Sequence, residues 1–319
     1  MFSRRKVIKL SVLAGASLSL PAGLLQAASN FSKQSLITRA IPKTGEKLPV
    51  VGLGTSASFR RIAASDDVSQ LHQVIKILLE QGGSVFDTAP GYGESEQVAG
   101  KIVQQLDAAK KVFWATKVNV VPRGGKTADA EKAKAQIKNS FKYIGKDPID
   151  LIQVHNLRDI PTQMGILKEL KEAGRVRYIG TTSTRDSNFP DLAAVMRNEP
   201  IDFIGVNYAV DDRRAAEEIF PIAQELGIAV MVYLPFGRSR LWKRIANQKV
   251  PEWAGEIGIK SWGQFFLKYV AAHPAVTVVT PATSKPKHVL DNIGAAYGEL
   301  PDKAIQKKMV DFIDALPAA

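Results

Sequence analysis

Eight short apolar runs, each followed by a longer segment with helical spacing of its apolar residues, constrain the fold of this chain most strongly. Most of the runs are rich in β-branched residues, as strands are when a parallel sheet buries them on both faces. They occupy residues 50–54, 84–89, 112–118, 149–155, 178–183, 201–208, 228–234 and 276–283. Eight strand–helix units in one domain favour a closed (β/α)8 barrel over an open sheet. We therefore predict an α/β fold of the TIM-barrel type.

The segments around these units predict a hairpin, a long loop and a final helix. Residues 35–39 and 47–50 flank a Thr44-Gly45 turn, which predicts a β-hairpin that closes the far end of the barrel. Helices are predicted, among others, at 67–81, 94–106, 215–226, 261–272 and, at the chain's end, 302–316. Residues 236–260 are predicted to form a longer loop after the seventh strand. Since no repeat or linker interrupts the pattern, residues 29–319 form one predicted barrel domain.

The first 28 residues have the organisation of a secretory signal peptide. A charged segment with Arg4, Arg5, Lys6 and Lys9 precedes an uncharged run that extends to about Ser29. The paired arginines resemble the twin-arginine signal, so we expect export to the periplasm by the twin-arginine machinery, with cleavage near Ala28. An uncleaved membrane anchor is the alternative, which Pro21 and two glycines in the run disfavour. No stable membrane insertion is expected after processing.

Composition excludes several classes of function. The 319 residues are 45% apolar and 23% charged, as in ordinary soluble proteins. The chain has no cysteine, and His72, His155, His273 and His288 are scattered, so we expect neither a disulfide nor a metal site. The net charge is +12, but the basic residues are spread over amphipathic helices such as 126–143, and we expect no binding to nucleic acid.

Polar side chains follow three successive predicted strands. Asp87 ends the second strand and Tyr92 follows in its loop, while Lys117 and His155 end the next two. Taken singly, each has a structural explanation: Asp87 could cap a helix, and His155 could be a satisfied core residue. Together they lie at the end of a barrel where active sites form.

These side chains can protonate a carbonyl oxygen while a hydride reaches the carbon. The pKa of a tyrosine is ordinarily about 10, and an ammonium about 4 Å away would lower it by about three units. Lys117 would have this effect on Tyr92, and Asp87 would keep Lys117 charged by pairing with it. His155 would donate a hydrogen bond to the substrate oxygen and orient it.

With these residues in place, the chain resembles the aldo-keto reductase superfamily over nearly all of residues 35–316. The matching segments are 86–93, 115–117, 150–155, 174–180, 232–237 and 281–292. The resemblance implies a barrel in which Tyr92 is the general acid, Asp87 and Lys117 adjust its acidity, and His155 positions the carbonyl. It also implies a nicotinamide cofactor, normally NADPH, bound without a dinucleotide-binding fold. Gly52-Leu-Gly54 is accordingly no Rossmann fingerprint, since the third glycine is missing.

The resemblance also implies positions for the cofactor. Tyr233 should stack on the nicotinamide, near Thr182 and Ser183. Thr55 and the loop with Pro235, Phe236, Gly237 and Arg238 should lie near the ribose and pyrophosphate, where Arg238 could pair with phosphate. The adenosine and its 2′-phosphate should meet Thr283, Ser284, His288, Asp291 and Asn292.

Several residues depart from the family pattern. Thr182-Ser183 stands where many members have Ser-Asn, and Gly205 where many have Gln, so we expect a weaker grip on the carboxamide. Ala282 and His288 replace a lysine and an arginine that often meet the 2′-phosphate, which leaves NAD(H) as an alternative cofactor. The short tail after the last helix predicts an open substrate mouth.

Three functions remain at this point. The leading prediction is an exported reductase of a small or medium-sized aldehyde or ketone. A redox sensor or binding subunit that keeps the fold with little turnover is the alternative. A lyase that uses Lys117 as a Schiff-base amine is more remote, because it gives Asp87 and Tyr92 no task.

Overall fold

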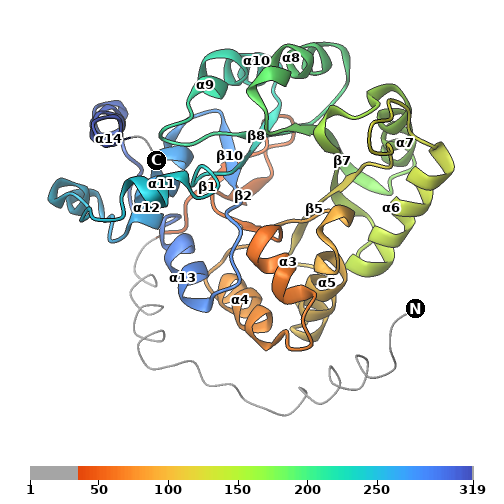
Figure 1. Cartoon of the computed structure of the whole chain (residues 1–319). Coiled ribbons are helices and arrows are strands. Elements are labelled where there is room, and N and C mark those ends of the chain that lie inside the picture. Colours follow the sequence, from red (N-terminus) through yellow and green to blue (C-terminus); the bar gives the residue numbers. More distant parts are fainter. Residues whose placement is uncertain (1–34, 318–319) are drawn as a thin grey trace.

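A closed parallel barrel forms the centre of the computed structural model, which describes residues 35–317 (Figure 1). Its strands are hydrogen-bonded in chain order from the first to the last. They are β3 (Leu53–Gly54), β4 (Val85–Asp87), β5 (Phe113–Val118), β6 (Ile149–Val154), β7 (Val176–Ser183), β8 (Phe203–Asn207), β9 (Ala229–Tyr233) and β10 (Val276–Val279). Parallel bridges from Val51 to Val279 and from Gly54 to Ala282 close the ring. The predicted (β/α)8 barrel is confirmed.

Helices surround the barrel, and they cover the outer face of its strands (Figure 1). The helices that follow the strands are α4 (Ser69–Glu80), α5 (Ser95–Gln105), α6 (Ala130–Ile144), α7 (Ile160–Glu172), α8 (Phe189–Asn198), α9 (Arg214–Glu218), α10 (Phe220–Glu225), α12 (Trp262–Ala272) and α13 (Pro286–Gly294). The predicted final helix is α14 (Lys303–Asp314), and the Asp302 side chain caps it by accepting from the Ile305 N–H. None of the helices in residues 35–317 combines the length and apolar character needed to cross a membrane.

Two details of the helix prediction are wrong. The segment 215–226 is two short helices, α9 and α10, because Pro221 near the start of α10 cannot donate a backbone hydrogen bond to the preceding turn. The segment 236–260 is not a plain loop, since it contains α11 (Arg240–Arg244) and the 3-10 helix η5 (Glu252–Ile257). A further helix, α3 (Ala57–Ala63), follows β3 without having been predicted.

Apolar side chains fill the barrel near the amino-terminal ends of its strands. Phe113, Tyr178 and Phe203 pack with ring centres 5.5 to 6.0 Å apart. The predicted hairpin, formed by β1 (Thr38–Ala40) and β2 (Lys47–Pro49), adds Ile41 and Leu48 to this inner core. The interior of the barrel is therefore filled at this end, which leaves the opposite end for a cavity.

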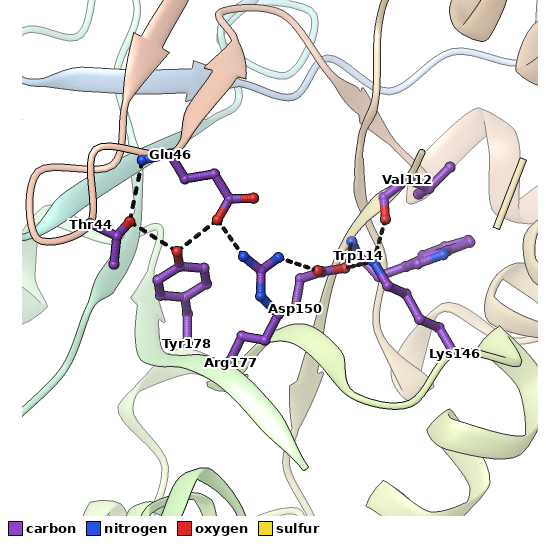
Figure 2. Close-up of polar contacts among 8 residues, drawn as sticks. All are labelled: Thr44, Glu46, Val112, Trp114, Lys146, Asp150, Arg177 and Tyr178. Carbon is purple, nitrogen blue, oxygen red and sulfur yellow. Dashed lines mark hydrogen bonds and ion pairs between the residues drawn. The ribbon is translucent and has the colours of Figure 1, made fainter. Parts of the chain in front are cut away.

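A polar network joins the hairpin to the barrel wall (Figure 2). Arg177 binds Glu46 of the hairpin and, 2.7 Å away, the Asp150 carboxylate of β6. The second oxygen of Asp150 accepts from the Trp114 backbone N–H at 2.8 Å and from Lys146 at 2.6 Å. Asp150 is only 1% exposed, so its charge is compensated entirely by these neighbours.

We expect Asp150→Asn to lower the free energy of unfolding by about 2 kcal/mol. The amide keeps the shape but leaves Arg177 and Lys146 without their shared anion, and their partial exposure to water reduces the loss below that of a fully buried pair. Urea unfolding followed by far-ultraviolet circular dichroism measures the difference. Asp311→Asn, which breaks an exposed pair with Lys307 on α14, is the control and should change stability by less than about 0.5 kcal/mol. Equal losses in both variants would contradict this account.

Candidate functional site

The carboxyl ends of β4, β5 and β6 bring the four predicted catalytic side chains to one place. Asp87 is the last residue of β4, Lys117 lies next to the end of β5, and His155 directly follows β6. Tyr92 ends a short 3-10 helix, η2 (Pro90–Tyr92), in the loop after β4. All four line a single cavity of about 420 Å³. The strand order that the sequence predicts thus brings Asp87, Lys117 and His155 together, and the loop after β4 adds Tyr92.

A buried ion pair lies at the floor of this cavity. The Lys117 Nζ atom is 2.7 Å from Asp87 Oδ1 and 2.8 Å from the Thr88 carbonyl oxygen, to which it also donates. Burial alone would lower the pKa of Lys117, but the charges of Asp87 and Tyr92 and their hydrogen bonds raise it above its ordinary value. Burial raises the pKa of Asp87, and the Lys117 ammonium opposes that rise. The short distance fits a carboxylate paired with an ammonium.

Tyr92 lies directly beside this pair. The Lys117 Nζ atom is 5.2 Å from the centre of the Tyr92 ring. Burial raises the pKa of Tyr92 above its ordinary value, although Lys117 lowers it by its charge and by a hydrogen bond. The predicted lowering toward neutrality is therefore wrong in direction, because burial outweighs the Lys117 ammonium and the Asp87 carboxylate also raises the pKa of Tyr92. Tyr92 consequently holds its hydroxyl proton at neutral pH.

His155 faces Tyr92 across the cavity. The two ring centres are 6.1 Å apart and the rings are nearly perpendicular, at 83°. Burial and the nearby Lys117 charge lower the pKa of His155 to about 3. The imidazole is therefore neutral at physiological pH, with one N–H available to donate to a ligand.

Tyr233 belongs to the same cluster, in a way the sequence did not indicate. Its hydroxyl donates to Asp87 Oδ1 at 3.0 Å and accepts from the Gln153 side chain at 3.0 Å. Its ring centre lies 5.2 Å from Lys117 Nζ, so the ammonium sits between two tyrosines. Gln153 is a polar residue near the carboxyl end of β6, between the apolar Ile152 and Val154, and this was the signal that could have revealed the contact.

Gly205 has a steric function in this arrangement. A Cβ atom at this position would lie 2.3 Å from the Tyr233 ring. The glycine therefore does more than remove the glutamine ligand expected for the carboxamide. It leaves the space in which the Tyr233 ring covers β8. The aromatic face of Tyr233 thereby forms part of the cavity wall.

Most predicted cofactor residues near the barrel mouth lie on this cavity, but not all of them. Thr182, Tyr233, Pro235, Phe236 and Arg238 line it, and Ser183 lines the cavity next to it. Gly237 lies in the same loop with a φ of +55°.

Thr55 lies next to the cavity and not on its lining. It is fully buried, and its hydroxyl donates to the Asp87 carbonyl oxygen at 3.1 Å. Its neighbours Ser56 and Ala57 line the cavity instead. The Thr55 hydroxyl therefore has a partner within the protein, and its role toward the cofactor stays a prediction.

The five residues predicted to meet the adenosine lie outside the cavity lining, on the segment after β10 and on α13. Thr283 and Ser284 are buried beside Pro281 and Ala282, which do line the cavity, and His288 is exposed. Asn292 is buried, and Asp291 accepts from Ser261 at 2.7 Å and from the Gln264 side chain at 3.0 Å. The Asp291 carboxylate thus joins α13 to α12, which is a structural task that the sequence did not indicate.

Strained backbone surrounds the cavity. Among the described residues, seven other than glycine have a positive φ, and four of these line it: Ala57, Asn156, Leu234 and Arg238. Such conformations persist where the surrounding structure enforces them, and they concentrate at binding sites. In residues 35–317 no group of histidines and carboxylates is arranged to hold a metal ion.

Comparisons with known proteins agree with this geometry. The model of the aldo/keto reductase family matches residues 50–309. The aldo-keto reductase str7 of Strobilurus tenacellus is 26% identical over 291 residues, which cover 80% of this chain and 84% of that protein. The aldo-keto reductase YhdN of Bacillus subtilis is 29% identical over 217 residues, covering 66% of this chain and 65% of that protein.

Solved structures share the fold. The holo form of aldo-keto reductase AKR11C1 from Bacillus halodurans superposes with a TM-score of 0.70 at 24% identity, covering 89% of this chain and 98% of that one. An aldo-keto reductase from Klebsiella pneumoniae in complex with NADPH gives a TM-score of 0.70 at 20% identity, covering 88% and 96%.

Proposed function

Because the chain belongs to the aldo/keto reductase family, we propose that it reduces a small or medium-sized aldehyde or ketone to an alcohol with NADPH, and that Tyr92 is the general acid. The observation that carries this proposal is the convergence of Tyr92, Lys117, Asp87 and His155 on one cavity. A lyase that uses Lys117 as a nucleophile is disfavoured, since that nitrogen is charged and held by Asp87 and Thr88.

The cavity walls support binding of a nicotinamide cofactor. The Tyr233 ring offers a flat aromatic face, and Arg238 is an exposed guanidinium on a fixed left-handed turn. Burial lowers the pKa of His288, and the charges of Lys285 and Lys287 lower it further, while Asp291 opposes them. The two lysines give positive charge to the segment predicted to meet the adenosine. This charge favours a 2′-phosphate, and therefore NADPH over NADH. NADPH supplies the hydride when it is bound.

The remaining steps belong to the side chains of this chain. The neutral His155 donates a hydrogen bond to the substrate oxygen and holds the carbonyl in place. Tyr92 then transfers its hydroxyl proton to that oxygen as negative charge develops there. Lys117 stabilises the resulting phenolate, and Asp87 keeps Lys117 charged and positioned. Each residue thus has a task that its contacts permit.

A fluorescence titration with NADPH and NADH tests the cofactor part of this proposal. We expect quenching of the protein's emission by both dinucleotides, with tighter binding of NADPH. An aldehyde panel then separates the reductase from the redox-sensor alternative, since a sensor would bind the dinucleotide but turn over no aldehyde. A protein that binds neither dinucleotide would contradict the proposal.

The pH dependence of reduction follows from the protonation states of Tyr92 and His155. The pKa of Tyr92 is raised above 10.0 and that of His155 is lowered to about 3, so neither group changes its protonation between these values. We expect kcat/KM for a neutral aldehyde to be level from about pH 5 to about pH 9. A decline centred near pH 7 would instead show a Tyr92 pKa near neutrality, and would contradict the structure's account of burial.

Export remains part of the proposal. The signal peptide predicted for residues 1–28 lies outside the described residues, and so does the twin-arginine pair. If that route is used, the protein folds and loads its cofactor before crossing to the periplasm. Mass spectrometry of protein purified from the periplasm should then detect the bound dinucleotide, whereas accumulation only in the cytoplasm would contradict this assignment.

A further inference from the structure

A second, larger cavity opens beside the one that holds the four catalytic residues. Its volume is about 690 Å³, and Asn156, Thr184 and Arg238 line both cavities. Its other lining residues come from the end of β7 and from the loops after β5, β6 and β7, and they include Arg123, Arg158 and Arg185. A molecule larger than a simple aldehyde can therefore extend from the catalytic cavity into this one.

All the charged side chains that line this second cavity are positive. Arg123, Arg158, Arg185 and Arg238 line it, and no aspartate or glutamate does. Within residues 35–317, none of these four arginines forms an ion pair, whereas Arg177, Arg213 and Arg240 each bind a carboxylate. The neighbouring acids are engaged elsewhere: Asp159 accepts from the Ala128 N–H, and Asp186 accepts from Asn207. An anion would supply the missing counter-charge.

One of these arginines and a backbone segment beside it are also held in position. Arg158 is half-buried, and its guanidinium donates to the Gly125 carbonyl oxygen at 2.8 Å, which ties the loop after β6 to the loop after β5. The backbone of Asn156 is fixed in the left-handed region and donates to Thr182 Oγ1 at 3.0 Å. Such preorganisation lowers the entropy cost of binding a ligand.

The position of three arginines separates them from the expected cofactor path. In the closed strand order, β6 lies opposite β10, whose following segment is the one predicted to meet the adenosine. Arg123, Arg158 and Arg185 follow β5, β6 and β7, on the side where His155 is found. Arg238, after β9, remains available for the cofactor's phosphates. The first three therefore face the substrate side of the site.

We propose that the physiological substrate is an anionic carbonyl compound, whose carboxylate or phosphate binds Arg123, Arg158 and Arg185 while its carbonyl oxygen reaches Tyr92 and His155. This inference rests on the proposed reductase function and specifies its substrate class. Arginine recognises both anions through paired, charge-assisted hydrogen bonds, so the two sources share one chemistry.

The test compares two aldehydes of similar shape, 4-carboxybenzaldehyde and 4-methylbenzaldehyde, and a second pair, glyceraldehyde 3-phosphate and glyceraldehyde. We expect the parent protein to give a higher kcat/KM for the anionic member of at least one pair, and the pair identifies the anion. Arg123→Ala and Arg185→Ala should each lower the anionic-to-neutral ratio about ten- to hundredfold, mainly through KM. Arg197→Ala, which removes an exposed arginine from α8, is the matched control and should keep the ratio.

Other results would contradict the anionic substrate but leave the proposed reductase function unaffected. A parent that prefers the neutral aldehydes, or variants that keep the ratio, would show that the arginines do not select the substrate. If Arg123→Ala and Arg185→Ala instead raised the dissociation constant for NADPH as much as they lowered the ratio, the arginines would bind the cofactor and not the substrate. If the parent turns over no aldehyde, calorimetric titration with terephthalate still tests the site, because Arg123→Ala and Arg185→Ala should weaken its binding and Arg197→Ala should not.

Discussion

Tyr92→Phe is expected to lower kcat for a neutral aldehyde by about a hundred- to ten-thousandfold, which is the usual contribution of a positioned general acid. Phenylalanine keeps the ring beside Lys117 and opposite His155, so the cavity and the NADPH affinity should be retained. Loss of absorbance at 340 nm under saturating NADPH measures the rate. The effect should fall on kcat rather than KM, because the proton is transferred only as the oxygen gains charge.

Tyr143→Phe is the matched control for this variant. Tyr143 lies on α6, away from the cavity lining, so loss of its hydroxyl should leave kcat within about twofold of the parent. If Tyr92→Phe retained the parental kcat while the control behaved as expected, another group would have to supply the proton.

Lys117→Met is expected to abolish measurable turnover and to destabilise the fold by about 3 kcal/mol. Methionine fills a similar space but leaves the Asp87 carboxylate buried without its ammonium, and it removes the cation that stabilises the Tyr92 phenolate. The pKa of Lys117 is raised by folding, so the stability that its charge contributes is present below pH 10.5 and is lost as pH rises through the higher folded value. Urea unfolding at pH 7.5 measures the loss.

The double variant Lys117→Met/Asp87→Asn separates stability from catalysis. Neutralising Asp87 removes the uncompensated charge, so the double variant should recover much of the lost stability. It should still show no turnover, since the cation remains absent. A double variant as unstable as Lys117→Met would mean that the ion pair is not the source of the stability difference.

The sequence predicted the barrel because the information is repeated along the chain. Eight apolar runs at strand length, separated by helical patterns, leave few alternatives for the topology, and the strand order follows from chain order. The short helices α3 and α11 escaped prediction because they lie in loops whose conformation depends on contacts with the barrel mouth. The division at Ile219 was marked by Pro221, but the apolar spacing continued across it.

The convergence of the four predicted catalytic side chains on one cavity could be predicted from the sequence, but their pKa values could not. Asp87, Lys117 and His155 end strands, and that position alone brings them together. The pKa direction of Tyr92 depends on burial, which no local pattern records, and this is why that prediction was wrong. The contact between Tyr233 and Gly205 and the arginine-lined cavity both join residues from strands or loops far apart in sequence.

Transfer of deuterium from NADPH labelled at the reactive carbon of its nicotinamide to an aldehyde tests the central claim most directly. The claim is that NADPH bound in this cavity supplies a hydride to the carbonyl carbon while Tyr92 donates a proton to the carbonyl oxygen. With the parent protein and 4-methylbenzaldehyde, mass spectrometry should detect an alcohol carrying deuterium on carbon, and Tyr92→Phe should yield almost none. Tight binding of the labelled cofactor with no labelled alcohol from the parent would contradict the claim, and would favour the sensor instead.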